Sequence, residues 1–138
     1  MIGLDTNVVV RLLVNDDDAQ HARALEALRH VDSQNPAYIT HIVLVETWWV
    51  LTRSYKTGQE VAVSAVRALV ANDEVAVERP EFVQQALRAV EQGADFADAM
   101  IDATQRRSGC DESVTFDQQA AKTLVRCHST CHEAGAAA

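Results

Sequence analysis

The sequence predicts an α/β protein, an α/β/α sandwich in which helices cover a central parallel sheet. Short apolar runs typical of strands alternate with longer segments of helical periodicity. Strands that are separated by helices pair in parallel, because a parallel connection needs a crossover of a dozen or more residues. The chain has 138 residues, of which 48% are hydrophobic, so it suits one domain with one core.

The first half of the chain is predicted to contain two strands and four helices. A strand over 2–4 is apolar and ends at Asp5, and Thr6 and Asn7 are typical of a helix start. The helix over 41–55 is apolar around most of its circumference, which predicts a central position. The other elements are a helix over about 17–32, a strand over 37–40 and a helix to about 71 that opens with a capping-box pattern at 57–60.

The second half is predicted to contain two strands and three helices. In order, these are a strand over 74–78, a helix from Pro80 to about 91, a helix over 94–107, a strand over 112–116 and a helix over 118–125. We expect one domain over 1–125. Residues 126–138 have weak patterning and an Ala-rich end, which predicts a partly disordered C-terminal tail.

Composition and charge exclude several classes of protein. No apolar run approaches the roughly 18 residues that span a bilayer, and no signal peptide is recognisable, so we expect a cytoplasmic protein without membrane contact. Three cysteines make no even disulfide framework and are expected to be reduced. A net charge of −8 argues against binding nucleic acid by bulk electrostatics, although it allows an enzyme that holds phosphate through metal ions.

Two acids directly follow predicted strands. Asp5 comes after 2–4, and Asp117 comes after 114–116. In open parallel sheets, ligands bind beyond the carboxyl ends of the strands, so both acids are expected at that edge. Each acid could instead only cap the helix that follows it, with roughly even odds for either one taken singly.

Two further acids lie within predicted helices. Glu46 lies in an apolar helix, where a buried carboxylate is costly unless something pairs with it. Asp98 is flanked by Asp95 three residues before it and Asp102 four residues after it, so all three acids can share one helix face. Carboxylates that converge from several elements repel one another, and a hard divalent cation such as Mg²⁺ or Mn²⁺ relieves that repulsion.

Four segments, taken together, resemble the PIN domain and are most similar to the VapC-type toxins of bacterial toxin–antitoxin pairs. The segments are 2–9 around Asp5, 43–46 ending in Glu46, 95–101 around Asp98 and 115–117 ending in Asp117. The likeness covers about residues 1–125 in the family's order and spacing. One motif alone is weak evidence, and the series of four is strong.

The resemblance implies an endoribonuclease that uses Mg²⁺, with Mn²⁺ as an alternative. It implies that Asp5 is the central metal ligand, that Asp98 is the second, and that Glu46 and Asp117 complete the acidic site. The supporting polar residues are then Thr6, Asn7, Asp95 and Thr115. The resemblance further implies a homodimer, a small antitoxin as inhibitor and structured RNA as substrate.

The sequence departs from the family pattern at two places. Asp102 stands where a small apolar residue is expected, and it could be an outer-shell group or only a surface residue. The C-terminus lacks the apolar strand that usually closes this fold and carries Cys and His four residues apart within 127–132. That spacing could bind zinc, but we favour an incidental polar tail.

Other functions are less well supported by the residues. A phosphatase with an Asp nucleophile needs a second acid two residues after the first, and Asn7 stands there. Adjacent Trp48 and Trp49 point about 100° apart on a helix, so they are expected in packing rather than in one stacking platform. The main alternative is a catalytically inactive PIN-like module that binds RNA or protein.

The basic residues near the motifs are candidate phosphate contacts. For each of them a solvated surface role remains the favoured interpretation. They are Arg11, Arg53, Lys56, Arg106, Arg107 and Lys122.

Overall fold

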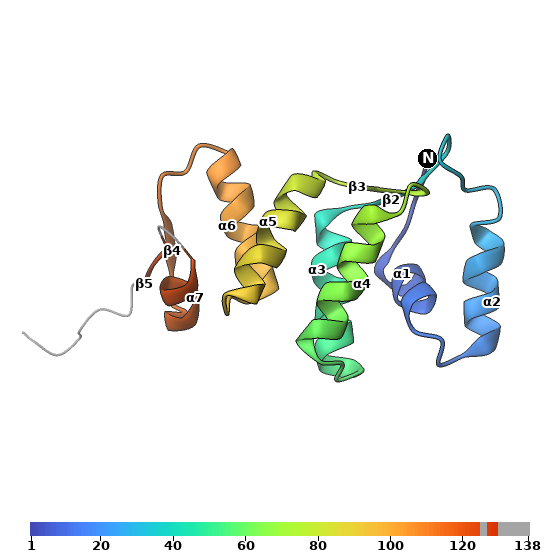
Figure 1. The fold of residues 1–138 in the computed structure, drawn as a ribbon, viewed down its shortest axis with the longest axis horizontal. Helices are drawn as coiled ribbons and strands as arrows, with labels where there is room; N and C mark the ends of the chain where they lie inside the picture. The colour runs from blue at the N-terminus through green and yellow to red at the C-terminus, as the bar shows by residue number, and fades with distance from the viewer. Residues whose placement is uncertain (125–126, 130–138) are drawn as a thin grey trace, which may run out of the picture. The chain divides into compact units, whose positions relative to one another are not determined.

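A computed structural model describes residues 1–124 and 127–129 of the protein. The chain forms two compact units, Met1–Pro80 and Glu81–Ala138. Figure 1 labels the α-helices and the strands β2 to β5. Among these described residues, no helix is long and apolar enough to cross a membrane.

The first unit is built on a parallel sheet of three strands in the order β1-β2-β3. The strands are β1 (Ile2–Gly3), β2 (Ala37–Ile39) and β3 (Val75–Val77), with Ala37 paired to Ile2 on one side and to Val75 on the other. The predicted α/β class and the parallel pairing are confirmed. The sheet's central strand is the best buried, because Ala37 and Ile39 are 1% and 0% exposed.

Two α-helices follow β1 and two follow β2 in this unit. They are α1 (Thr6–Leu13), α2 (Asp18–Ala27), α3 (His41–Trp49) and α4 (Gln59–Ala71). Side chains cap three of them, because Asp5, Asp17 and Thr40 each accept a hydrogen bond from an amide in the first turn. Helix α2 ends at Ala27, earlier than predicted, and buries only Ala24.

The region after α3 differs from the single helix predicted over 41–55. A π-helix over Val50–Ser54 continues α3, and Lys56 then adopts a left-handed conformation with φ of 52°. The predicted capping box is wrong. Gly58 is the N-cap of α4 without a side-chain hydrogen bond, while the Thr57 hydroxyl donates instead to the carbonyl of Leu51 at 3.1 Å.

The second unit contains three helices and a short parallel sheet. The helices are α5 (Pro80–Glu91), α6 (Phe96–Arg107) and α7 (Gln118–Thr123), and the strands are β4 (Ser113–Thr115) and β5 (Cys127–Ser129). Between α5 and α6, Gly93 has φ of 105°, which favours glycine at that turn. The core of this unit includes Phe96, Val83 and Val90, each at most 1% exposed.

The strand β5 was not predicted from the sequence. It pairs in parallel with β4, with Val114 opposite His128. The strand forms although the sequence there is not apolar, because ladder pairing does not require an apolar sequence. The predictions for the rest of the tail, over 130–138, lie outside the described residues.

Candidate active site

Asp5 lies at the point where β1 passes into α1. Its Oδ1 accepts a hydrogen bond from the amide of Val8 at 3.0 Å, so Asp5 is the N-cap of α1. The side chain is exposed. The cap uses one carboxylate oxygen in this hydrogen bond, so capping and ligand binding are compatible roles for the same group.

Glu46 on α3 is held by the start of α1. The Thr6 hydroxyl donates to Glu46 Oε2 at 2.5 Å, across 40 residues of sequence. This bond joins Glu46 to the residue directly after Asp5. The supporting role predicted for Thr6 thus has a physical basis in unit 1, whereas Asn7 is exposed and has no hydrogen bond to either acid among the described residues.

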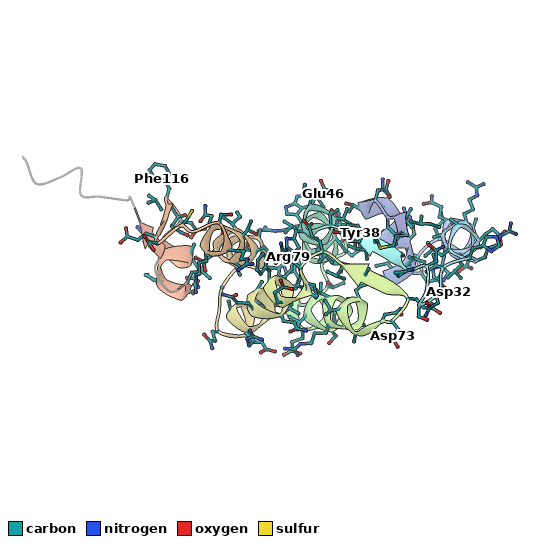
Figure 2. The ribbon with its side chains drawn as sticks, turned by 90° about the horizontal axis from the view of Figure 1, so that it is seen from above. Asp32, Tyr38, Glu46, Asp73, Arg79 and Phe116 are labelled. Carbon is teal, nitrogen blue, oxygen red and sulfur yellow. The ribbon has the colours of Figure 1, made fainter. Side chains whose placement is uncertain are left out.

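Glu46 does not pay a burial cost, although its helix is apolar. Its side chain is exposed, and Figure 2 labels it on α3. The helix is apolar on its exposed face as well, where Ile42 and Trp49 are 73% and 59% exposed, so its composition did not reveal which face is buried. Trp48, at 7% exposure, packs in the core, so the two tryptophans differ in burial.

In the second unit, three acids lie near the start of α6. Asp95 is the N-cap of α6, and its Oδ2 accepts from the amide of Asp98 at 3.2 Å. Partial burial raises the pKa of Asp98, and the negative charges of Asp95 and Asp117 raise it further. The carboxyl groups of Asp95 and Asp117 are therefore close enough to Asp98 to influence its charge.

Asp117 lies between β4 and α7. Its Oδ1 accepts from the amides of Gln119 and Ala120 at 2.7 and 3.2 Å, so it is the N-cap of α7. Thr115 supports it from the strand, since the Thr115 hydroxyl accepts from the backbone amide of Asp117 at 2.9 Å. The intervening Phe116 is 80% exposed and is labelled in Figure 2.

Asp102 is neither a surface residue nor a free ligand. It is 4% exposed, and its Oδ2 forms an ion pair with Arg106 at 2.5 Å. The Ser113 hydroxyl lies 3.2 Å from Asp102 Oδ1 and 2.6 Å from the Gln105 side-chain oxygen, so this group joins α6 to the first residue of β4. Asp98, Asp102, Ser113 and Thr115 line the same pocket of about 150 Å³.

The Asp102 network is the feature that sequence reasoning missed. The signal was present, because Asp102 and Arg106 are four residues apart on one helix, a spacing that favours an ion pair. By joining α6 to β4, the network fixes the element that carries Asp98 against the strand that leads to Asp117.

The structure brings the predicted site residues together in two groups. Unit 1 holds Asp5, Thr6 and Glu46, and unit 2 holds Asp95, Asp98, Thr115 and Asp117. That Asp5, Glu46, Asp98 and Asp117 form a single site stays a prediction.

The predicted ligands in the two units are of a kind that binds a hard divalent cation. In the part of the chain that the structure describes, no three Asp, Glu, His or Cys side chains already form a metal-holding group. The fit rests on the donors themselves. All four predicted ligands are carboxylates, and Asp98 is destabilised in its charged form by two neighbours, which a hard cation would relieve. Half of the proposed zinc ligands, Cys131 and His132, lie outside the described residues.

No curated protein matches the chain. Among solved structures, it is similar to Mycobacterium tuberculosis VapC20, described as a Sarcin-Ricin loop cleaving toxin, with 24% identity and a TM-score of 0.44 over 91% of this chain and 98% of that chain. The PIN-domain profile matches residues 2–124. That match confirms the predicted α/β/α fold class, and the chain belongs to the PIN-domain family.

Proposed function

We propose that this PIN-domain protein is a metal-dependent endoribonuclease and the toxin of a toxin–antitoxin pair. The observation that carries the proposal is the acidic group of unit 2, in which partial burial raises the pKa of Asp98 and the charges of Asp95 and Asp117 raise it further. Such mutual repulsion disfavours the folded protein, so it is typical of functional sites rather than of structural ion pairs. Asp5 and Glu46 of unit 1 occupy the remaining acidic positions of the family motif.

The proposal gives each residue a separate role. Asp5, Glu46, Asp98 and Asp117 would hold Mg²⁺ or Mn²⁺. Thr6 fixes the rotamer of Glu46 by its hydrogen bond, and the cap bonds of Asp5 and Asp117 hold one oxygen of each carboxylate in place. A bound divalent ion supplies a more acidic water and stabilises negative charge on phosphate oxygens.

The direct test is RNA cleavage by the purified protein. We expect cleavage in Mg²⁺ or Mn²⁺ and none in EDTA. Asp5→Asn should lose on the order of 10²-fold or more in rate, because it removes a charged ligand where charge develops. Asn is as good an N-cap as Asp, so the variant should remain folded.

A matched control is Asp73→Asn, which changes the same charge on an exposed acid after α4 (Figure 2). It should retain wild-type activity. Full activity of Asp5→Asn in metal-depleted buffer with Mg²⁺ restored would show that the proposed site is wrong. A folded wild type with no nuclease activity would favour the inactive binding module.

The proposed partners rest on the motif resemblance. The protein would act on RNA in the cytoplasm, form a homodimer and be inhibited by a small antitoxin. An Arg side chain of such a partner would pair with the carboxylates and so compete with the cation. Expression of the protein alone should slow growth, and co-expression of the adjacent small gene should relieve this.

The Asp5→Asn variant separates nuclease toxicity from other toxicity. It should be harmless in cells and still bind the antitoxin in a pull-down with purified components. Undiminished toxicity of that variant would assign the growth defect to something other than the nuclease site.

A further inference from the structure

An open pocket of about 310 Å³ lies between α1 and α2 in the first unit. Its polar lining comes from Asn7 and Arg11 on α1 and from Gln20 and Arg23 on α2. The rest of the lining is aliphatic, from Val8, Ala24 and Ala27. Among the residues that the structure describes, no acid lines this pocket, although the chain has 20 Asp and Glu residues against 12 Lys and Arg.

The chemistry of this lining favours an anion. Two guanidinium groups and two side-chain amides all offer N–H donors, and guanidinium groups match phosphate oxygens in geometry. Asp16 pairs with one of these guanidinium groups, that of Arg11, so the charge available to an anion is that of Arg23.

The two arginines differ in how they are held. Arg11 Nη1 donates to Asp16 Oδ1 at 2.7 Å and to the Tyr55 hydroxyl at 3.3 Å, so this guanidinium is fixed in orientation. Tyr55 also donates to Asp16 at 3.0 Å, which lowers the pKa of Asp16 and keeps the anchoring carboxylate ionised. Arg23 is exposed and forms no ion pair with the described residues, so it supplies the uncompensated charge.

The pocket begins beside the proposed metal ligand. Asn7 is two residues after Asp5, and Arg11 is one helical turn beyond Asn7, a rise of about 6 Å along α1. A chain of phosphates with one member at Asp5 would place a neighbouring phosphate within reach of this lining. The acids of the site repel RNA, and a cationic pocket at their edge offsets that repulsion.

We propose that the pocket between α1 and α2 binds a backbone phosphodiester of RNA next to the one that is cut. This inference rests on the proposed nuclease function and adds a substrate contact to it. Arg23 contributes the net charge and Arg11 the fixed donor geometry, while Asn7 and Gln20 donate from their amides. The contact is to the backbone, so it acts on RNA of any sequence.

The test compares two charge-matched variants for binding to a labelled oligoribonucleotide. Both are made in the Asp5→Asn background, where cleavage does not interfere. Arg23→Gln removes the pocket charge. Arg29→Gln removes an equal charge just beyond α2 from a residue that does not line the pocket and pairs with Glu26 at 2.8 Å.

We expect Arg23→Gln to weaken binding about fivefold to tenfold at 0.1 M salt, because one phosphate contact contributes a slope of about 0.7 to 1 in log K against log salt. The salt slope should fall by that amount, and Arg29→Gln should leave it unchanged. In the active protein, which keeps Asp5, the single substitution Arg23→Gln should raise the KM for RNA by the same factor. Thermal unfolding should be equal for the two variants, because both sites are exposed.

The outcomes separate the pocket from the nuclease. Equal RNA affinity and salt slope in the two variants, together with RNA cleavage by wild type, would overturn the pocket and leave the nuclease standing. Arg23-dependent binding without cleavage by wild type would support the pocket and overturn the nuclease.

Discussion

At the scale of single residues, Asp98 links the chemistry of the site to its stability. Its pKa is raised above 3.8, first by burial and then by Asp95 and Asp117, so folding disfavours its charged form. A raised pKa stabilises the folded protein fully below 3.8, and that contribution is lost as the pH rises through the folded-state value. Without metal, Asp98 therefore destabilises the protein at neutral pH.

We predict that Asp98→Asn stabilises the metal-free protein at pH 7 and not at pH 3. The measurement is the free energy of urea unfolding of wild type and variant across that range, in EDTA. Most other acids titrate alike in the two proteins, so their effects cancel when the two free energies of unfolding are subtracted. This difference in free energy should grow from about pH 4 upward. A difference that is independent of pH would show that Asp98 is not destabilised in its charged form.

A second residue-scale prediction concerns the buried ion pair of Asp102 and Arg106. Asp102→Ala removes the carboxylate that pairs with the Arg106 guanidinium and should lower the free energy of unfolding by about 2 kcal/mol or more. This loss is somewhat smaller than for a fully buried pair, because the Arg106 side chain is 33% exposed. The double variant Asp102→Ala/Arg106→Leu should recover most of that loss, because it leaves no unmatched charge.

The measurement for this pair is urea unfolding of the two variants beside Arg106→Leu alone. A double variant no more stable than Asp102→Ala would mean that the network stabilises through Ser113 and Gln105 rather than through the ion pair.

At the scale of elements, the acids of the site also begin helices. Asp117 caps α7, which has only six residues, through two amide hydrogen bonds. We predict that Asp117→Ala lowers the free energy of unfolding by about 1 kcal/mol, whereas Asp117→Asn changes it by a few tenths. Both variants should lose RNA cleavage, because neither Ala nor Asn supplies a charged metal ligand. Asn preserves only the helix cap.

Chemical denaturation and cleavage assays on the same preparations would separate the two roles. Retained cleavage by Asp117→Asn would reduce Asp117 to a helix cap. Asp5 permits the same comparison at α1, where it accepts from one amide.

At the scale of the whole molecule, a cation bound only by the native state must stabilise it. We predict that millimolar Mn²⁺ raises the Tm of wild type, because the ion relieves carboxylate repulsion and binds the folded chain. The variant Asp5→Asn/Asp98→Asn should gain little. Equal shifts of Tm in the two proteins would place the ion elsewhere on the molecule.

The sequence by itself determined the order of the strands and α-helices as far as α7 and the local place of each acid. Asp5 and Asp117 follow strands, as predicted, and each caps the next helix, which the sequence had left open as the alternative role. Apolar runs, cap residues and helix periodicity act over a few neighbouring residues. The same motifs identified the PIN family, which the match over residues 2–124 confirms. Local rules were sufficient for these features.

Only the tertiary structure decided burial and long-range pairing. Glu46 is exposed and bonded to Thr6, 40 residues away, although its helix is apolar on several faces. Asp102 is buried against Arg106 and Ser113, although an acid in that position suggested surface or outer-shell placement. These outcomes depend on which elements pack against a residue, because desolvation and pairing are properties of neighbours that are remote in sequence.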